Sequence, residues 1–123
     1  MPRDILRVAT RRPRDILHVA TRQQLTASDI LNAVANASGV PKRQLLGGRG
    51  ANRVAHSRML AMWLAHERTG KSLTAIGRDM GGRDHTTVTH AVNRWPELRD
   101  ADADLARLER EVTARLERQG EAA

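Results

Sequence analysis

The sequence predicts an all-α fold, a small helical bundle, and two observations predict it. The two tryptophans are the only aromatic residues among 123, so the core has to be built from Leu, Ile, Val, Met and Ala, which suit helices better than sheets. From Thr26 onward, apolar residues recur at helical spacing, and Gly and Pro separate the segments. A chain of this length can bury a core without disulfides or metal.

The first 25 residues contain a tandem repeat. PRDILRVATR at residues 2–11 recurs as PRDILHVATR at residues 13–22, with His18 in place of Arg7. Two copies are too few for a solenoid, and the second proline disfavours one continuous helix. We expect a mostly disordered basic arm over residues 1–25, which is either a duplication without function or an addition that contacts phosphates.

Two helices are expected next. Thr26 stands three residues before Asp29, which predicts a capping box at the start of the first helix. Gly39 and Pro41 end that helix, and Pro41 is the expected first residue of a short second one. The glycine-rich run GGRGANR follows at residues 47–53 and predicts a flexible cationic loop.

A longer helix is expected from about residue 53 to residue 68. Arg58 and His66 flank its predicted buried stripe, which comprises Val54, Ala55, Met59, Met62, Trp63 and Ala65. Ser72 can cap the next helix, and DHTTVTHAVNRW at residues 84–95 can form another after the Gly81-Gly82 turn. Two short helices joined by a tight glycine turn make a helix-turn-helix.

Pro96 is expected to break that helix. The remaining segment, residues 97–120, predicts an amphipathic closing helix, whose apolar face comprises Leu98, Leu105, Leu108, Val112 and Leu116. This face can pack on its own domain or on a partner. Packing on its own domain is favoured, because three heptads are the minimum for a coiled coil. We expect one domain over residues 26–119 and a short tail over residues 120–123.

The charge distribution indicates a polyanionic partner. Residues 1–95 contain 16 Lys and Arg against 6 Asp and Glu, whereas residues 96–123 contain 5 against 8. A basic body favours nucleic acid, and a merely solvated basic surface is the alternative. The chain has no cysteine, no apolar run near the roughly 18 residues that span a membrane, and no apolar signal-peptide core at its start. We expect a cytoplasmic, nucleoid-associated protein without a membrane partner.

Two other patterns, one typical of nucleotide binding and one of metal binding, do not fit their surroundings in the sequence. AHERTGKS at residues 65–72 departs by one residue from a phosphate-binding loop, but a helix leads into it where that loop needs a strand. We therefore expect no nucleotide binding, and Gly70 and Ser72 are interpreted as helix caps. His85 and His90 are five residues apart, whereas zinc-binding helices use a spacing of four. We expect no metal, no cofactor and no catalysis.

Residues 84–87 are better suited to reading DNA bases than to binding a metal or to catalysis. Small polar residues at the N-terminal end of the second helix are what a recognition helix presents to the major groove. Asp84 can accept from a cytosine amino group, His85 can bond to an acceptor edge, and the methyl groups of Thr86 and Thr87 can contact thymine methyls. The alternative is that Asp84 only caps the helix and the threonines are exposed without a role.

The run SLTAIGRDMGGRDHTTVTHAV at residues 72–92 closely resembles the signature of the C-terminal DNA-binding domain (domain IV) of the bacterial chromosomal replication initiator DnaA. The likeness covers about residues 27–119. It implies an all-helical fold of the TrpR and DnaA domain IV type. It also implies binding of double-stranded DNA at nonamer boxes resembling TTATCCACA, at replication origins and some promoters. We expect a stand-alone reading domain, without the family's ATPase core and N-terminal interaction domain.

The resemblance also implies which residues contact DNA. Residues 84–87 match the family's major-groove contacts, and Arg58 matches an arginine that reaches a base. Gly50 aligns with the family's minor-groove arginine, so Arg49 is the expected substitute, and Arg53 is expected to hold the backbone or the minor groove. Weaker phosphate candidates are Lys42, Arg43, Ser72, Thr74 and Arg83.

Together these observations predict a monomeric, non-enzymatic protein that binds DnaA-box-like sites and regulates replication initiation or transcription. The competing hypothesis is a protein-interaction module. In that hypothesis the N-terminal arm or the closing helix recruits a replication or regulatory partner, and DNA binding is vestigial.

Overall fold

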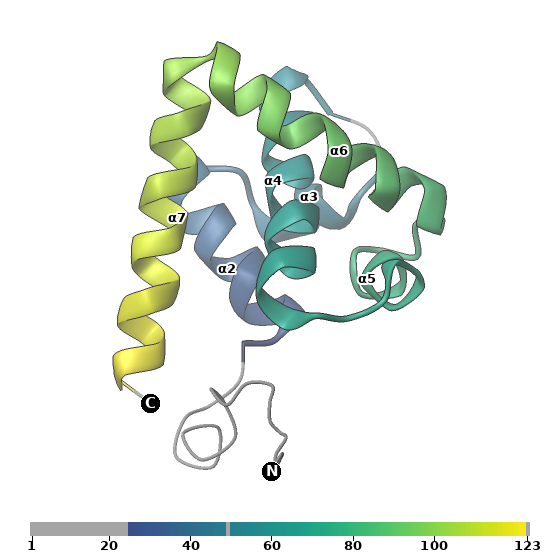
Figure 1. Ribbon diagram of the computed structural model, residues 1–123, viewed down its shortest axis with the longest axis horizontal. Helices are drawn as coiled ribbons and strands as arrows, with labels where there is room; N and C mark the ends of the chain where they lie inside the picture. Colours follow the sequence, from purple (N-terminus) through teal and green to yellow (C-terminus); the bar gives the residue numbers. More distant parts are fainter. Residues whose placement is uncertain (1–24, 49, 123) are drawn as a thin grey trace, which may run out of the picture. The chain divides into compact units, whose positions relative to one another are not determined.

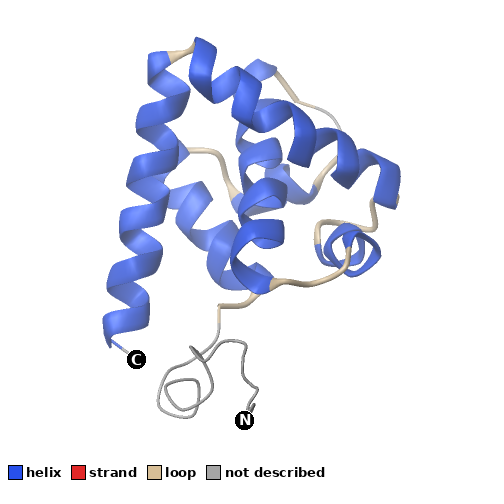
Figure 2. Ribbon diagram, in the orientation of Figure 1, coloured by secondary structure: helices blue, strands red, loops and turns tan. Residues whose placement is uncertain are grey.

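The computed structural model describes residues 25–48 and 50–122. Over these residues the chain forms helices and no strand, which confirms the predicted all-α fold (Figures 1 and 2). The helices are α2 (Ala27–Ser38), α3 (Lys42–Leu46), α4 (Asn52–Thr69), α5 (Leu73–Asp79), α6 (His85–Ala101) and α7 (Ala103–Ala122). The duplicated arm, apart from Leu25, and Arg49 lie outside the described residues.

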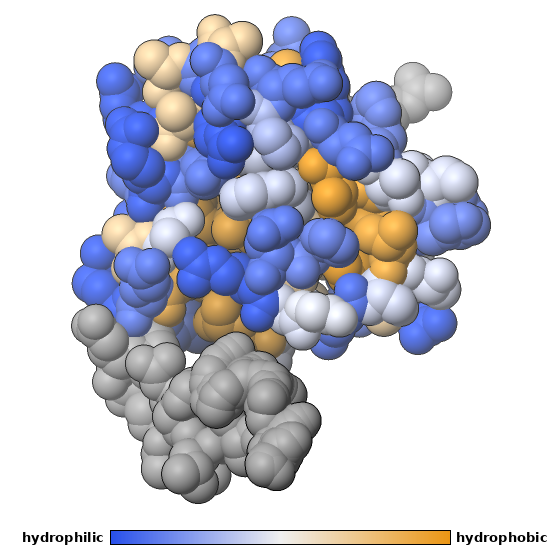
Figure 3. Space-filling view, in the orientation of Figure 1, coloured by the Kyte–Doolittle hydropathy of each residue, from blue (hydrophilic) through white to orange (hydrophobic). Residues whose placement is uncertain are grey.

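Residues 25–116 form one compact unit around α4. This helix packs against α2, α3, α5 and α6 (Figure 1). The core is aliphatic except for Trp95, which is the largest fully buried side chain. Figure 3 shows that hydrophilic residues cover much of one face of the molecule, with apolar patches between them.

The predicted stripe on α4 was wrong in part. Ala55, Met59 and Trp63 are only half-buried, whereas Leu60 and Leu64 are buried. The reason is that α4 has neighbours on several sides, so its buried surface is wider than one stripe. A single-face pattern describes a helix at the edge of a bundle and not one at its centre.

The predicted helix ends are mostly confirmed. The Thr26 N–H donates to Asp29 Oδ2 over 2.9 Å, and the Asp29 N–H donates to Thr26 Oγ1 over 3.1 Å, which completes the capping box. Gly70 ends α4 in the left-handed region at φ 70°, and the Ser72 hydroxyl accepts from the Ala75 N–H over 3.1 Å. Pro41 is the N-cap of α3 and not its first helical residue.

The expectation that Pro96 ends its helix was wrong. Helix α6 continues through Pro96 to Ala101, so Leu98 belongs to α6 and the closing helix begins only at Ala103. Contacts on both sides of Pro96 hold the helix: the Trp95 Nε1–H donates to Glu109 Oε1 over 2.7 Å, and Arg99 Nη1 donates to the same carboxylate over 3.0 Å. They compensate for the one backbone hydrogen bond that proline removes.

The chain turns instead at Asp102. Its Oδ1 accepts from the Asp104 N–H over 2.9 Å, which caps the start of α7. Val112 and Leu116 are buried on the inner face of α7, so this helix packs on its own domain as expected. The helix continues to Ala122, through most of the segment expected to be a tail.

Glu109 is predicted to be the residue that fixes α6 to α7. Glu109→Ala leaves the Trp95 indole N–H without its acceptor, and we expect it to lower the free energy of unfolding by about 1–3 kcal/mol. The control is Glu97→Ala, which removes an exposed ion pair with Arg94 and should change stability by less than about 0.5 kcal/mol. Urea unfolding followed by tryptophan fluorescence measures both, and equal losses would contradict the assignment.

Candidate nucleic-acid interface

Two glycines of the α5–α6 region allow its close packing. A Cβ at Gly77 would lie 2.2 Å from the Arg83 carbonyl oxygen, and the Arg83 N–H donates to the Gly77 carbonyl over 2.8 Å. Gly81 has a φ of 90°, and a Cβ there would lie 2.4 Å from the Leu46 carbonyl oxygen at the end of α3. The turn is therefore in backbone contact with α5 on one side and with α3 on the other.

Asp84 caps the helix that follows this turn. Its Oδ2 accepts from the Thr86 N–H over 3.0 Å and also from the Thr86 hydroxyl. The hydrogen bond from that hydroxyl lowers the pKa of Asp84, and the bond from the Thr86 N–H lowers it further. The capping role that the sequence left as an alternative is thus present.

The four residues predicted to read bases form one exposed surface. Asp84, His85, Thr86 and Thr87 are all exposed, at the start of α6 beside α5 (Figure 1). His85 Nδ1 lies 3.7 Å from Asp84 Oδ1, and the His85 side chain is 59% exposed. Asp84 and Thr86 bond to each other. The His85 ring Nε2 and the Thr87 hydroxyl make no hydrogen bond within the described residues.

His90 continues this surface, although its sequence pattern was interpreted only in terms of a metal ligand. It is exposed and lies four residues after Thr86 and three after Thr87, so the three share one face of α6. Thr87 and His90 line a recess of about 450 Å³ together with Met59 and Met62 of α4. The spacing of residues 86, 87 and 90 was the signal that could have identified it.

Arg58 and Arg83 lie beside the same recess, but their guanidiniums bond to the protein backbone. Arg58 is 9% exposed; its Nε donates to the Leu45 carbonyl over 2.9 Å and its Nη2 to the Gln44 carbonyl over 2.7 Å. Arg83 Nη1 donates to the Met80 carbonyl over 2.9 Å, and its Nη2 donates to the Gly47 carbonyl. Both cations thus hold the C-terminal end of α3, where helix carbonyls favour positive charge.

Burial has an electrostatic consequence for these two arginines. Desolvation lowers the pKa of Arg58 and of Arg83, and the positive charge of Arg58 lowers the pKa of Arg83 further. Two cations are kept close together because carbonyl oxygens accept from both. The base contact expected for Arg58 and the phosphate contact expected for Arg83 remain predictions.

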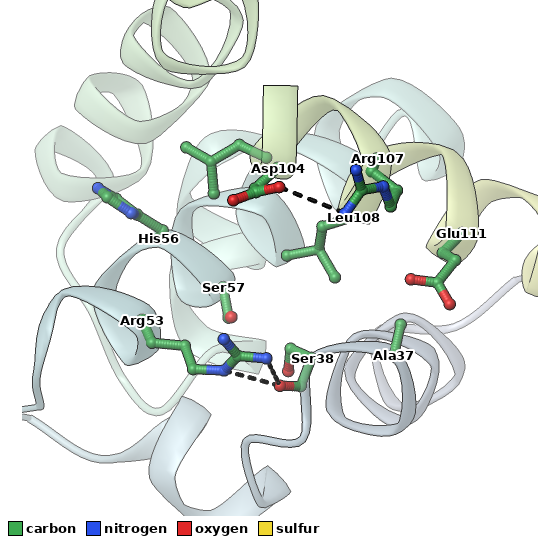
Figure 4. Close-up of a pocket in the computed structure, with 10 residues that line it drawn as sticks. Ala37, Ser38, Arg53, His56, Ser57, Asp104, Arg107, Leu108 and Glu111 are labelled. Atoms are coloured by element: carbon green, nitrogen blue, oxygen red, sulfur yellow. Dashed lines mark hydrogen bonds and ion pairs between the residues drawn. The ribbon is translucent and has the colours of Figure 1, made fainter. Parts of the chain in front are cut away.

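The other predicted contact residues are spread over the surface. Arg53 donates from Nε to the Ser38 carbonyl over 2.9 Å and lines a different pocket, between α2, α4 and α7 (Figure 4). Lys42 donates to the Ser28 hydroxyl over 2.9 Å. Arg43, Ser72 and Thr74 are exposed. The structure thus brings Arg58, Arg83 and Thr87 together and leaves Arg53 apart from them.

Over residues 25–48 and 50–122, no three His, Asp or Glu side chains gather in a way that could hold a metal ion. Over the same residues, no helix combines the length and the apolar character needed to cross a bilayer.

The two glycines of the turn should respond differently to alanine. Gly82 has a φ of 77°, and no atom lies within 4 Å of the position that a Cβ would take, so Gly82→Ala should cost only the left-handed backbone energy of about 1–2 kcal/mol. Gly81→Ala adds a collision with the Leu46 carbonyl and should cost clearly more. Urea unfolding of both variants tests this, and equal losses would show that the turn does not depend on its contact with α3.

Comparison with known proteins identifies the family. Residues 27–94 match the family described as bacterial dnaA protein helix-turn-helix. Over 84 residues the chain is 46% identical to the chromosomal replication initiator protein DnaA of Caulobacter vibrioides, which covers 68% of this chain and 17% of that protein. Over 94 residues it is 45% identical to the DnaA protein of Xanthobacter autotrophicus, covering 76% of this chain and 18% of that protein. The chain therefore belongs to the bacterial DnaA helix-turn-helix family.

Proposed function

We propose that this chain binds double-stranded DNA at DnaA-box-like sites, with the N-terminal end of α6 in the major groove. The observation that carries the proposal is the exposed polar surface of residues 84–87, held on a turn that packs against both α3 and α5. The similarity to replication initiator proteins supports it. We extend the proposal to a role in replication initiation or transcription, on chromosomal DNA in the cytoplasm.

The hydrogen bonds within this surface indicate which of its polar groups are available for contacts with DNA bases. His85 and Thr87 have polar groups available for base edges, and the methyl groups of Thr86 and Thr87 suit thymine methyls. Asp84 Oδ2 is occupied by the cap, while Oδ1 is available to accept from a cytosine amino group. We propose that His90 extends the contact surface by one helical turn.

Arg58 and Arg83 support the proposal through a different route from the direct contacts expected of them. Their bonds to the end of α3 fix the start of the basic loop at residues 47–50. A segment with a fixed start loses less conformational entropy on binding than a free one. We propose that Ser72 and Thr74, at the start of α5, and the exposed Arg43 bind phosphates.

Loss of His85 should lower sequence-specific affinity. His85→Ala is expected to weaken binding to a duplex carrying TTATCCACA by about 1–3 kcal/mol and to leave binding to a scrambled duplex almost unchanged. Fluorescence anisotropy at two salt concentrations measures both affinities. The matched control is Arg110→Ala, an exposed change on α7 that should have no effect on selectivity.

Two results would argue against the proposal. Equal, salt-sensitive binding of the unmodified chain to both duplexes would indicate a basic module without sequence readout. Unchanged box affinity in His85→Ala would favour the protein-interaction alternative.

Substitution of Asp84 separates its two roles. Asparagine retains the capping oxygen, so Asp84→Asn should unfold at nearly the same urea concentration as the unmodified chain, whereas Asp84→Ala should lose about 1 kcal/mol. If the Asp84 carboxylate also accepts a hydrogen bond from a cytosine amino group, the Asp84→Asn protein should bind the box more weakly although it is as stable as the unmodified chain. Normal affinity in a stable Asp84→Asn protein would mean that Asp84 only caps the helix.

A further inference from the structure

A second pocket lies away from the proposed base-reading residues. It has a volume of about 390 Å³ and is bounded by the end of α2, the first turns of α4 and the first half of α7 (Figure 4). This volume lies within the range of roughly 300–1,000 Å³ that is typical of small-molecule sites. Arg53, one of the residues expected to contact DNA, lines this pocket, but the family signature at residues 72–92 does not reach it.

The pocket contains a buried hydroxyl without a partner. Ser57 is 1% exposed, and its Oγ has no hydrogen-bond partner within the described residues. Figure 4 shows this oxygen directed into the pocket, on the side of Arg53 and Ser38. A serine within a helix can donate to the carbonyl four residues earlier, and no such bond is made here. A buried polar group of this kind gains free energy when a ligand supplies the missing bond.

The α4 side of the pocket is suited to a carboxylate. The Nε and Nη2 of Arg53 both donate to the Ser38 carbonyl, which holds the guanidinium in place. Its Nη1 has no partner within residues 25–48 and 50–122. A fixed guanidinium nitrogen and an unpartnered hydroxyl that line the same pocket suit the oxygens of a carboxylate.

The α7 side carries negative charge and apolar surface. Asp104 and Glu111 line the pocket from positions two helical turns apart. The only ion pair that Asp104 makes within the described residues is with Arg107, over 3.3 Å, and both side chains are largely exposed. Leu105 and Leu108 line the pocket between the two carboxylates.

The charges of the pocket define the kind of ligand it suits. Two cations, Arg53 and Arg107, are balanced by two anions, Asp104 and Glu111. A phosphate or another polyanion would gain little in such a site, because the carboxylates would repel it. A zwitterion with an apolar group meets all three surfaces of the pocket.

We propose that this pocket binds a free α-amino acid with an aliphatic side chain. Its carboxylate accepts from Ser57 Oγ and Arg53 Nη1, its ammonium group donates to Glu111, and its side chain lies against Leu105 and Leu108. The ligand joins α4 to α7 and therefore stabilises the fold in proportion to its concentration. DNA binding is not needed for this interaction.

The experiment is an NMR titration of the ¹⁵N-labelled full chain with L-leucine. We expect saturable shifts of backbone amides in residues 53–57 and 104–111. Two analogues are the comparators: 4-methylpentanoate lacks the ammonium group and 3-methylbutylamine lacks the carboxylate. Each should bind about tenfold more weakly or worse, because it loses one charge-assisted set of hydrogen bonds.

Two variants make the test specific. Ser57→Ala and Glu111→Gln should each weaken L-leucine binding, whereas Arg110→Ala, outside the pocket, should not. Ser57→Ala removes an unpartnered buried hydroxyl, so its melting temperature should be equal to or above that of the unmodified chain, which separates lost binding from unfolding. The absence of saturable shifts, equal binding of both analogues, or unchanged binding in Ser57→Ala and Glu111→Gln would overturn the proposal.

Discussion

The contact between the end of α3 and the turn joining α5 to α6 is the constraint on which the proposed DNA surface depends. At Gly81 the turn approaches the Leu46 carbonyl so closely that no side chain fits, and Arg83 spans from the Met80 carbonyl to the Gly47 carbonyl. The same contact fixes two segments at once: the start of α6, which carries His85 and Thr87, and the start of the basic loop. Their relative position is therefore set by backbone packing and by the fork of one guanidinium.

Features that depend on neighbours in sequence were predictable. The capping box at Thr26, the Ser72 cap and the Asp84 start of α6 are confirmed because each needs only residues within one helical turn. The grouping of residues 84–87 on one exposed surface followed from their place at the start of a helix.

Features that depend on distant residues were not predictable in the same way. The continuation of α6 past Pro96 relies on Glu109, which lies on a different helix. Arg58 donates to carbonyls of residues 13 and 14 positions earlier, and the sequence pattern did not predict these bonds. A side chain at such a position is directed by tertiary packing, and the helical pattern of α4 alone does not contain that information.

Helix α4 connects the pocket and the DNA surface to which we assign functions. Ser57 and Arg58 are consecutive, and consecutive side chains on a helix point about 100° apart. Ser57 faces the pocket shared with α7, and Arg58 faces the end of α3. One central helix can therefore serve a small-molecule pocket and the support of the DNA surface, with neither site interrupting the other.

The dependence of the DNA surface on α3 is tested most directly by the ratio of box affinity to scrambled-duplex affinity in Arg83→Lys. Lysine keeps the charge but cannot span the Met80 and Gly47 carbonyls as the planar guanidinium does. We expect selectivity to fall in a protein that stays folded, because the start of α6 and the basic loop lose their fixed relation while non-specific attraction to phosphates persists. Unchanged selectivity in a folded Arg83→Lys protein would contradict this dependence, since the DNA surface would then not need the contact with α3.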